Sequence, residues 1–321
     1  MPRKLALFTG PWSDIPLEEL VSKAHEWGYQ ELDLACWGEH LAVQKALSEP
    51  DYGRSILELL AEHNLKLNAI SQHAVGQAVA DQLSHYHSTT LPEWVWGDGV
   101  HEAVHARAAQ EMIDTAKVAQ QLGVNLVHAA TGSPFSLQHQ WLGYGSPEVT
   151  VQCWKIFTDR WKPILTEFEK MNIMLACEVG PAQTAFDIYS TQETIQALEG
   201  QLSYSLAISP AALHWHGVDP IEYLRQFSDR ISQILVQDVA VTLNGRSSLL
   251  GSLLPDGDYR RGWNHRAPGY GNLDWPSLLR TLHQIHYEGP VTVCIKDADI
   301  NKDHAAAEAV HFIRRLDYEP A

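Results

Sequence analysis

Short apolar segments alternate with longer amphipathic segments eight times along this chain of 321 residues. The amphipathic segments repeat their apolar residues at helical spacing, as Leu17–Ala24 does at i, i+3, i+4 and i+7. Eight strand–helix units are typical of an α/β fold, the (β/α)8 TIM barrel, in which a closed parallel sheet lies inside a ring of helices. The expected strands are residues 4–9, 31–35, 65–71, 125–129, 173–179, 204–208, 231–237 and 291–296.

The loops between these segments differ in length on the two sides of the expected barrel. The predicted helices are residues 16–27, 52–63, 102–122, 150–171, 191–198, 220–227, 275–285 and 303–316. Turns from helix to strand are short, whereas the strand-to-helix loops 72–100, 130–149 and 238–273 are long, as expected of a barrel with its site at the carboxyl ends of the strands. We predict a single TIM-barrel domain over residues 1–321. An open α/β sheet with a cap domain is the alternative, but no linker-like segment favours it.

Charge and hydropathy argue against several classes of partner. The chain has 23 Lys and Arg against 39 Asp and Glu, a net charge of −16, so its surface repels a nucleic-acid backbone. Neither a signal-peptide core nor the run of about 18–20 apolar residues that spans a membrane is present. The four cysteines are widely spaced, which indicates neither a disulfide framework nor a zinc ribbon. We therefore expect a cytoplasmic protein that binds neither nucleic acid nor membrane.

Tryptophan is concentrated where a binding site is expected. Of the 11 Trp residues, seven follow the carboxyl ends of predicted strands: Trp12, Trp37, Trp94, Trp96, Trp141, Trp215 and Trp263. Indole rings at a barrel mouth can stack on the apolar face of a sugar, or they can fix long loops to the barrel. Both interpretations stay open for each ring.

Several short motifs occur in a characteristic order. They are Leu7–Trp12, Leu34–His40, Ile70–Ala78, Val95–Gly99, Gly217–Pro220 and Arg260–Trp263. In this order they resemble the sugar phosphate isomerase/epimerase family of the xylose-isomerase-like TIM-barrel superfamily, over essentially the whole chain. The resemblance implies a carbohydrate-like small-molecule ligand, and one Mn or Mg ion held by a Glu, an Asp, a His and a Glu from strands 5 to 8. It also implies proton abstraction next to a carbonyl, leading to isomerisation, epimerisation or elimination.

Most of the metal ligands that the resemblance implies are replaced in this chain. The four matching positions are Glu178, Ser209, Leu235 and Cys294. Only the first is kept, and a single carboxylate is a poor site for a divalent ion. We therefore predict that the family's Mn or Mg is lost and that no cofactor replaces it. A site with softer ligands, made of Glu178, Cys294 and either His214 or His216, stays open.

Lys296 is the candidate replacement for the ion. It lies two residues after Cys294 on the expected eighth strand, so both side chains should face the same way, with Lys296 near Glu178. As catalytic residues, we predict Lys296 to polarise a substrate oxygen and Glu178 or His73 to act as general base. The alternative is that Lys296 only neutralises a buried carboxylate. Cys294 is either a nucleophile or a packed core residue.

The remaining candidate residues are expected to bind substrate. They are Trp12, Trp37, Trp96, His128, Asp238, Arg261, Trp263 and His265. Arg261 belongs to a basic cluster with Arg260 and Arg266, which binds an anionic group or forms ion pairs at the rim. No Gly-rich nucleotide-binding loop is present.

Two functions from different classes remain. One is an enzyme of altered mechanism acting on a sugar or polyol ketone. The other is a catalytically inactive pseudoenzyme that binds a ligand or serves as a partner subunit. Homo-oligomer formation and pairing with an active paralog both stay open.

Overall fold

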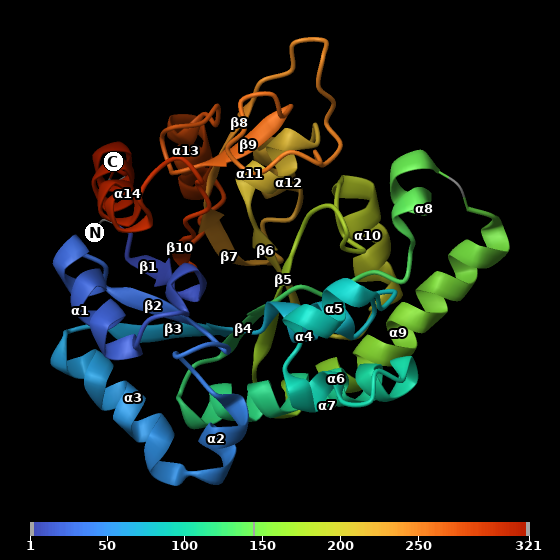
Figure 1. Ribbon diagram of the computed structural model, residues 1–321, viewed down its shortest axis with the longest axis horizontal. Helices are drawn as coiled ribbons and strands as arrows, with labels where there is room; N and C mark the ends of the chain where they lie inside the picture. Colours follow the sequence, from blue (N-terminus) through green and yellow to red (C-terminus); the bar gives the residue numbers. More distant parts are fainter. Residues whose placement is uncertain (1–2, 144, 319–321) are drawn as a thin grey trace. The chain divides into compact units, whose positions relative to one another are not determined.

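Eight parallel strands form a closed barrel in the computed structural model, which describes residues 3–143 and 145–318 (Figure 1). Around the barrel the strands follow the order β1-β10-β7-β6-β5-β4-β3-β2. Their bounds are β1 Leu5–Phe8, β2 Glu31–Ala35, β3 Lys66–Ser71, β4 Leu126–Ala129, β5 Met174–Glu178, β6 Tyr204–Ile208, β7 Ile231–Val236 and β10 Val291–Val293. The predicted (β/α)8 TIM barrel is confirmed.

All eight predicted helices are present, displaced by at most a few residues. They are α1 Leu17–Trp27, α3 Pro50–Glu62, α7 His101–Gln121, α9 Pro147–Lys170, α10 Ile188–Ala197, α12 Pro220–Gln226, α13 Trp275–Gln284 and α14 Lys302–Leu316. Side chains of Ser146, Asp187, Asp219, Asp274 and Asn301 accept backbone N–H bonds at the starts of five of them. The loops add short helices: η1 Gly10–Trp12, α2 Val43–Ser48, α4 His73–Ala78, α5 His85–Thr90, α6 Glu93–Trp96, α8 Leu137–Leu142 and α11 Pro210–Trp215.

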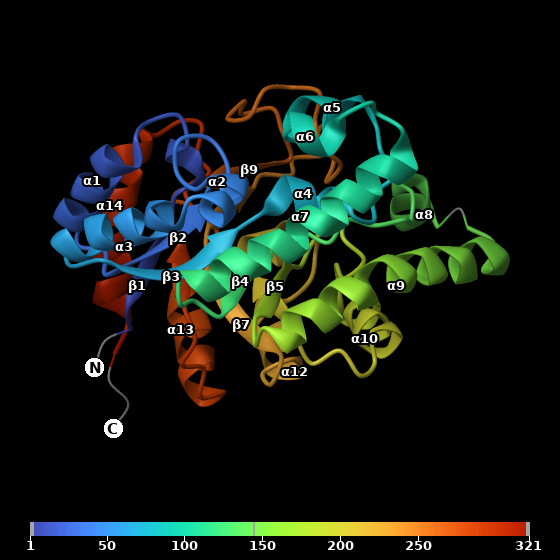
Figure 2. The ribbon, with the colours of Figure 1, turned by 90° about the horizontal axis from the view of Figure 1, so that it is seen from below.

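The chain divides into two compact units, which are described separately. One unit comprises Met1–His40, Leu57–Asn68 and Ala207–Ala321, and the other comprises Leu41–Ile56 and Ala69–Leu206. In the second unit α7 packs against both α4 and α9, and Figure 2 shows these helices side by side. Among the residues that the structure describes, no helix is long and apolar enough to cross a membrane.

The strands are apolar because they are enclosed on both faces. Every residue of β1, β4, β6 and β10 is buried. Some polar side chains inside the first unit bond to one another: Gln233 Nε2 donates to Asp33 Oδ2 and to Thr292 Oγ1, each at 2.9 Å.

The eighth strand is shorter than predicted, which corrects the expected placement of Cys294 and Lys296. The strand β10 ends at Val293, and the last bond along this edge runs from the Cys294 N–H to the Val236 oxygen at 3.1 Å. Cys294 is buried with Phe8 and Ala35, whereas Lys296 is exposed. Because β10 ends at Val293, strand alternation does not set the directions of the Cys294 and Lys296 side chains, and their common orientation stays a prediction.

A two-stranded antiparallel ribbon, not predicted from the sequence, follows β7. It pairs β8 (Asp238–Val241) with β9 (Trp263–Arg266). The carboxylate of Asp238 is buried and accepts bonds from the N–H groups of Val239, Gly269 and Leu273 and from Trp275 Nε1, at 2.8–3.3 Å. These four bonds hold the ends of this loop, and the predicted role of Asp238 in substrate binding stays a prediction.

Candidate functional site

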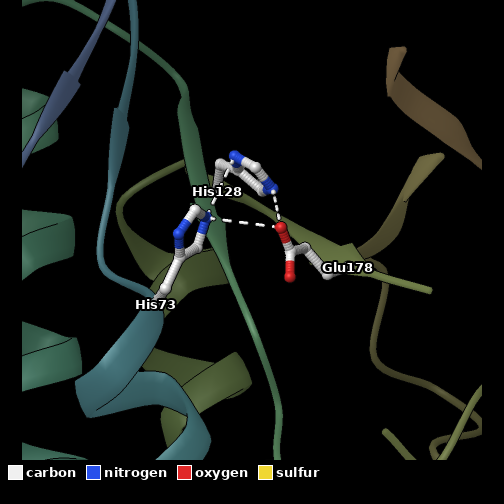
Figure 3. Close-up of side chains that lie close together, drawn as sticks. All are labelled: His73, His128 and Glu178. Carbon is white, nitrogen blue, oxygen red and sulfur yellow. Dashed lines mark hydrogen bonds and ion pairs between the residues drawn. The ribbon is translucent and has the colours of Figure 1, made fainter. Parts of the chain in front are cut away.

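Three candidate residues converge at the carboxyl ends of β3, β4 and β5, which are neighbours in the barrel (Figure 3). His73 is the first residue of α4, directly after β3, while His128 lies in β4 and Glu178 ends β5. His73 Nε2 lies 3.3 Å from His128 Nδ1, and Glu178 Oε1 lies 3.8 Å from His73 Nε2 and 3.6 Å from His128 Nε2. We call these three residues the His–His–Glu cluster.

The backbone and a hydroxyl fix the arrangement of the cluster. The N–H of Gln72 donates to the His128 carbonyl oxygen at 2.8 Å, which holds the start of α4 against β4. The Ser71 hydroxyl lies 3.2 Å from His128 Nδ1, and the two imidazole rings meet edge to face at 4.4 Å. Ser71 was not predicted as a site residue, although its place at the end of the strand just before His73 is a signal that points to it.

The cluster is open enough to meet a ligand. The His128 side chain is 1% exposed, whereas the side chains of His73 and Glu178 are 23% and 31% exposed. A carboxylate beside two imidazoles can accept a proton and pass it on. The ligand atoms also lie within 4.8 Å of one another, a spacing at which two nitrogens and one oxygen can hold a transition-metal ion.

The family's four-ligand metal set does not fit the residues at the matching positions. Leu235 is 1% exposed and carries no ligand atom. Cys294 packs in an apolar cluster with Phe8, Ala35 and Trp37. Ser209 caps α11 by accepting the Ala212 N–H, and its hydroxyl donates to Gln237 Oε1 at 2.9 Å. The apolar packing of Cys294 also counts against the softer site considered with His214 or His216.

In the other unit, aromatic and basic candidates gather on the ribbon. Trp263 stacks on Trp215 with ring centroids 4.2 Å apart, and the ring of His265 meets the edge of Trp263 at 5.4 Å. Burial and, second, the charge of Lys296 lower the pKa of His265 to about 4, so its imidazole is neutral at pH 7. The predicted ion pair between Lys296 and Glu178 stays a prediction.

The basic cluster forms ion pairs, the alternative that the sequence left open. Arg261 is 9% exposed, its Nη1 lies 2.8 Å from Asp256 Oδ1, and its guanidinium lies 5.4 Å from the Trp263 ring centroid. Arg260 pairs with Asp258 at 2.6 Å. Arg261 thus braces the ribbon loop, and the binding role predicted for it stays a prediction.

Three predicted ligand-stacking tryptophans differ in their surroundings. Trp12 is fully buried and donates from Nε1 to Asp303 Oδ1 at 2.7 Å, which favours the alternative that its ring packs in the core. Trp37 is half-buried, with its ring 5.8 Å from that of Phe8. Trp96 is half-buried at the end of α6. The binding roles of Trp37 and Trp96 stay predictions.

Solved structures share the fold at low sequence identity. The 3-keto-D-glucoside 4-epimerase YcjR from E. coli is 12% identical, with a TM-score of 0.68 over 98% of this chain and 99% of that one. The probable 3-DHS dehydratase AsbF from Bacillus anthracis is 14% identical, with a TM-score of 0.66 over 96% and 97%. The IOLI protein, solved with a zinc atom, is 16% identical, with a TM-score of 0.66 over 98% and 97%.

A search of curated proteins finds no match. In contrast, a family model described as xylose isomerase-like TIM barrel matches residues 21–316. This match covers most of the chain and agrees with the closed barrel of eight parallel strands. The chain therefore belongs to the xylose isomerase-like TIM-barrel family.

Proposed function

We propose that this protein acts on a sugar or polyol ketone by moving a proton next to the carbonyl, leading to isomerisation, epimerisation or elimination. The observation that carries the proposal is the His–His–Glu cluster, in which a carboxylate and two imidazoles lie within 3.8 Å at the carboxyl ends of three neighbouring strands. The names of two structural neighbours, an epimerase and a dehydratase, support this class of chemistry.

Each member of the cluster has a role in the proposed reaction. Glu178 removes the proton from the carbon beside the carbonyl, and His73 carries a proton to or from the product. His128, the most buried of the three, orients the other two. Lys296 supplies the positive charge that stabilises the enediolate oxygen, a role that rests on the sequence.

The proposal includes loss of the family's Mn or Mg. Leu235 and Cys294 are buried apolar residues where the family pattern has a His and a Glu, and Ser209 is occupied as a helix cap. The family ion, when bound, stabilises negative charge on substrate oxygens. Without it, that task falls to protein groups.

A second candidate function is a catalytically inactive subunit that binds a carbohydrate-like ligand or an active partner. The burial of Leu235 and Cys294 favours it, because apolar packing has filled positions that hold catalytic groups in the family pattern. Under this second proposal the His–His–Glu cluster contributes polar contacts to the ligand.

Proton exchange with solvent separates the two candidates without knowledge of the product. The protein is incubated in D2O with a panel of ketopentoses, ketohexoses and 3-keto glycosides, and the proton beside the carbonyl is followed by 1H NMR. We expect exchange of that proton in at least one ketone and a loss of about 10²–10⁴-fold in Glu178→Gln. The control Glu193→Gln removes an exposed carboxylate of α10 and should exchange normally.

Saturable ligand binding with no exchange on any ketone would favour the second candidate. Exchange that survives in Glu178→Gln would remove the cluster from the reaction.

A further inference from the structure

A buried glutamine lies between the segments that carry the His–His–Glu cluster. Gln183, in the loop after β5, is 7% exposed. Its Oε1 accepts the N–H groups of Thr131 and Gly132, both at 2.9 Å, and its Nε2 donates to Gln77 Oε1 at 2.7 Å. The orientation of this amide is therefore fixed, because a flipped amide would place its NH2 group against two backbone N–H groups.

The second glutamine continues the chain of hydrogen bonds in one direction. Gln77 Nε2 donates to Asp81 Oδ2 at 2.9 Å, and Asp81 Oδ1 accepts the Ser133 N–H at 2.9 Å. Asp81 Oδ2 also lies 3.2 Å from Nε2 of the buried His87. In this series of hydrogen bonds Gln183 donates to Gln77, and Gln77 donates to Asp81. Gln183 and Asp81 also accept backbone N–H groups of the loop after β4.

This network connects the three backbone segments that follow the members of the His–His–Glu cluster in the sequence. Gln77 lies one helical turn after His73 in α4, Thr131 follows His128 by three residues, and Gln183 follows Glu178 by five. The segments are also in close contact: a Cβ atom on Gly132 would lie 2.1 Å from the Gln77 carbonyl oxygen. A shift of any one segment must therefore stretch a bond to Gln183 or to Gln77.

We infer that Gln183 is a positioning residue, whose amide keeps His73, His128 and Glu178 at the separations that proton transfer requires. This inference rests on the proposed function for its catalytic consequence. Displacements of about 1 Å are enough to lower a rate by about 10²-fold, and removal of supporting residues costs a site about 10–100-fold. The effect should appear in kcat more than in KM, because the side chain of Gln183 bonds to Thr131, Gly132 and Gln77, which are not substrate-binding candidates.

Two substitutions at one position test the donor and the acceptor separately. Gln183→Glu keeps the acceptor for Thr131 and Gly132 but loses the donor to Gln77 at neutral pH, and we expect kcat for proton exchange to fall about 10–100-fold with KM changed less than about twofold. At lower pH the introduced carboxyl is protonated, and its O–H can donate to Gln77 in place of the lost N–H. The defect should therefore shrink as the pH falls, whereas Gln183→Met should show the same defect at every pH.

An NMR measurement provides a readout that does not need activity. In 1H–15N spectra at one pH, we expect the imidazole signals of His73 and His128 to move in Gln183→Met and to stay in Gln140→Ala. The second variant is a matched control, because Gln140 Nε2 donates to the carbonyl oxygen of the same Gln183 at 2.9 Å and to Ser133 Oγ at 3.1 Å, while the described bonds from the Gln183 amide to Gln77, Thr131 and Gly132 stay intact.

Imidazole signals that coincide in Gln183→Met and the unchanged protein would overturn the positioning role. So would a defect in Gln183→Glu that is independent of pH. If the unchanged protein exchanges no proton, the proposed function fails, and the imidazole signals alone decide the role of Gln183.

Discussion

Gly76 is the position at which a single methyl group should disturb the candidate site most. This glycine lies in α4, three residues after His73, and a Cβ atom there would be 2.3 Å from the Ala130 carbonyl oxygen and 3.0 Å from the Ala129 Cβ. Carbon–oxygen contacts are normally about 3.3–3.6 Å, so Gly76→Ala requires α4 to move away from the end of β4 by about 1 Å. His73 starts this helix and must move with it, away from His128 and Glu178.

Two opposing effects decide the sign of the stability change. Alanine stabilises a helix interior relative to glycine by about 0.5–1 kcal/mol, whereas overpacking a close contact costs about 1–3 kcal/mol. We expect the second to prevail, because the nearest atom is a backbone oxygen. A net loss of about 1–2 kcal/mol lowers the melting temperature of a chain of this size by only a few degrees. The rate should suffer more, by about 10²-fold, because the reacting groups lose their alignment.

The assays are thermal unfolding by circular dichroism and proton exchange by 1H NMR. Gly53→Ala is the control: this glycine is also helical, in α3, but its nearest contact is the Leu122 Cδ2 at 3.1 Å, the end of a flexible side chain. We expect the control to keep its exchange rate and to keep or raise its melting temperature. Equal exchange rates and equal melting temperatures in the two variants would refute the argument that α4 packs too closely against the end of β4 to accept a methyl group.

The remaining predictions concern metal ions, pH and the ribbon. We expect Zn²⁺ or Co²⁺ to inhibit proton exchange by binding the nitrogen and oxygen atoms that move the proton, and His73→Ala should weaken this inhibition. EDTA should leave exchange intact. A requirement for added Mn²⁺ after EDTA treatment would contradict the loss of the family ion. Burial is the main cause that lowers the pKa of His40 and of His265 from 6.5 to about 4. As the pH drops from 6.5 toward 4, these imidazoles take up protons in the unfolded chain before they do so in the folded protein. The free energy of unfolding should therefore fall over this range. Urea titrations should show a flatter dependence for His40→Gln, and an unchanged slope would count against that assignment. Trp263→Ala removes the stack on Trp215, so limited proteolysis should cut within residues 242–262 faster than in the unchanged protein.

The sequence predicts the barrel well because each of its strands is enclosed. Residues 31–35 and 204–208 are almost entirely buried, although each run includes polar residues, and their predicted bounds agree with those of β2 and β6. The end of β10 was harder to predict, because Cys294 and Ile295 are as apolar as the strand before them. Burial alone does not show where hydrogen bonding to the next strand stops. The difference matters, because the common orientation predicted for Cys294 and Lys296 was argued from strand alternation, which stops at Val293.

The site was predicted residue by residue but not as a cluster. The sequence assigned catalytic roles to His73 and Glu178 and a separate binding role to His128, although β3, β4 and β5 follow one another in the barrel. The links that hold the cluster together are hydrogen bonds from side chains far apart in the chain, such as that between Gln183 and Gln77 across 106 positions. Such pairs have no local pattern, whereas strand ends do. The surroundings of Asp238 were not predicted for the same reason: three of the four donors to its carboxylate lie 31 to 37 positions away, and only the fold brings them together.

The buried carboxylate of Asp238 also has a consequence for how this protein can diversify. Because it binds Gly269, Leu273 and Trp275, the ribbon leaves the barrel and returns to it at almost the same place. The intervening residues 242–262 are largely exposed, with Leu253 completely so. Asp256 and Arg261 brace the later part of this stretch, so the exposed segment around Leu253 is the part of the ribbon loop that should best tolerate changes of length or sequence. It is the natural place to graft a loop from another member of the family or to insert a reporter sequence.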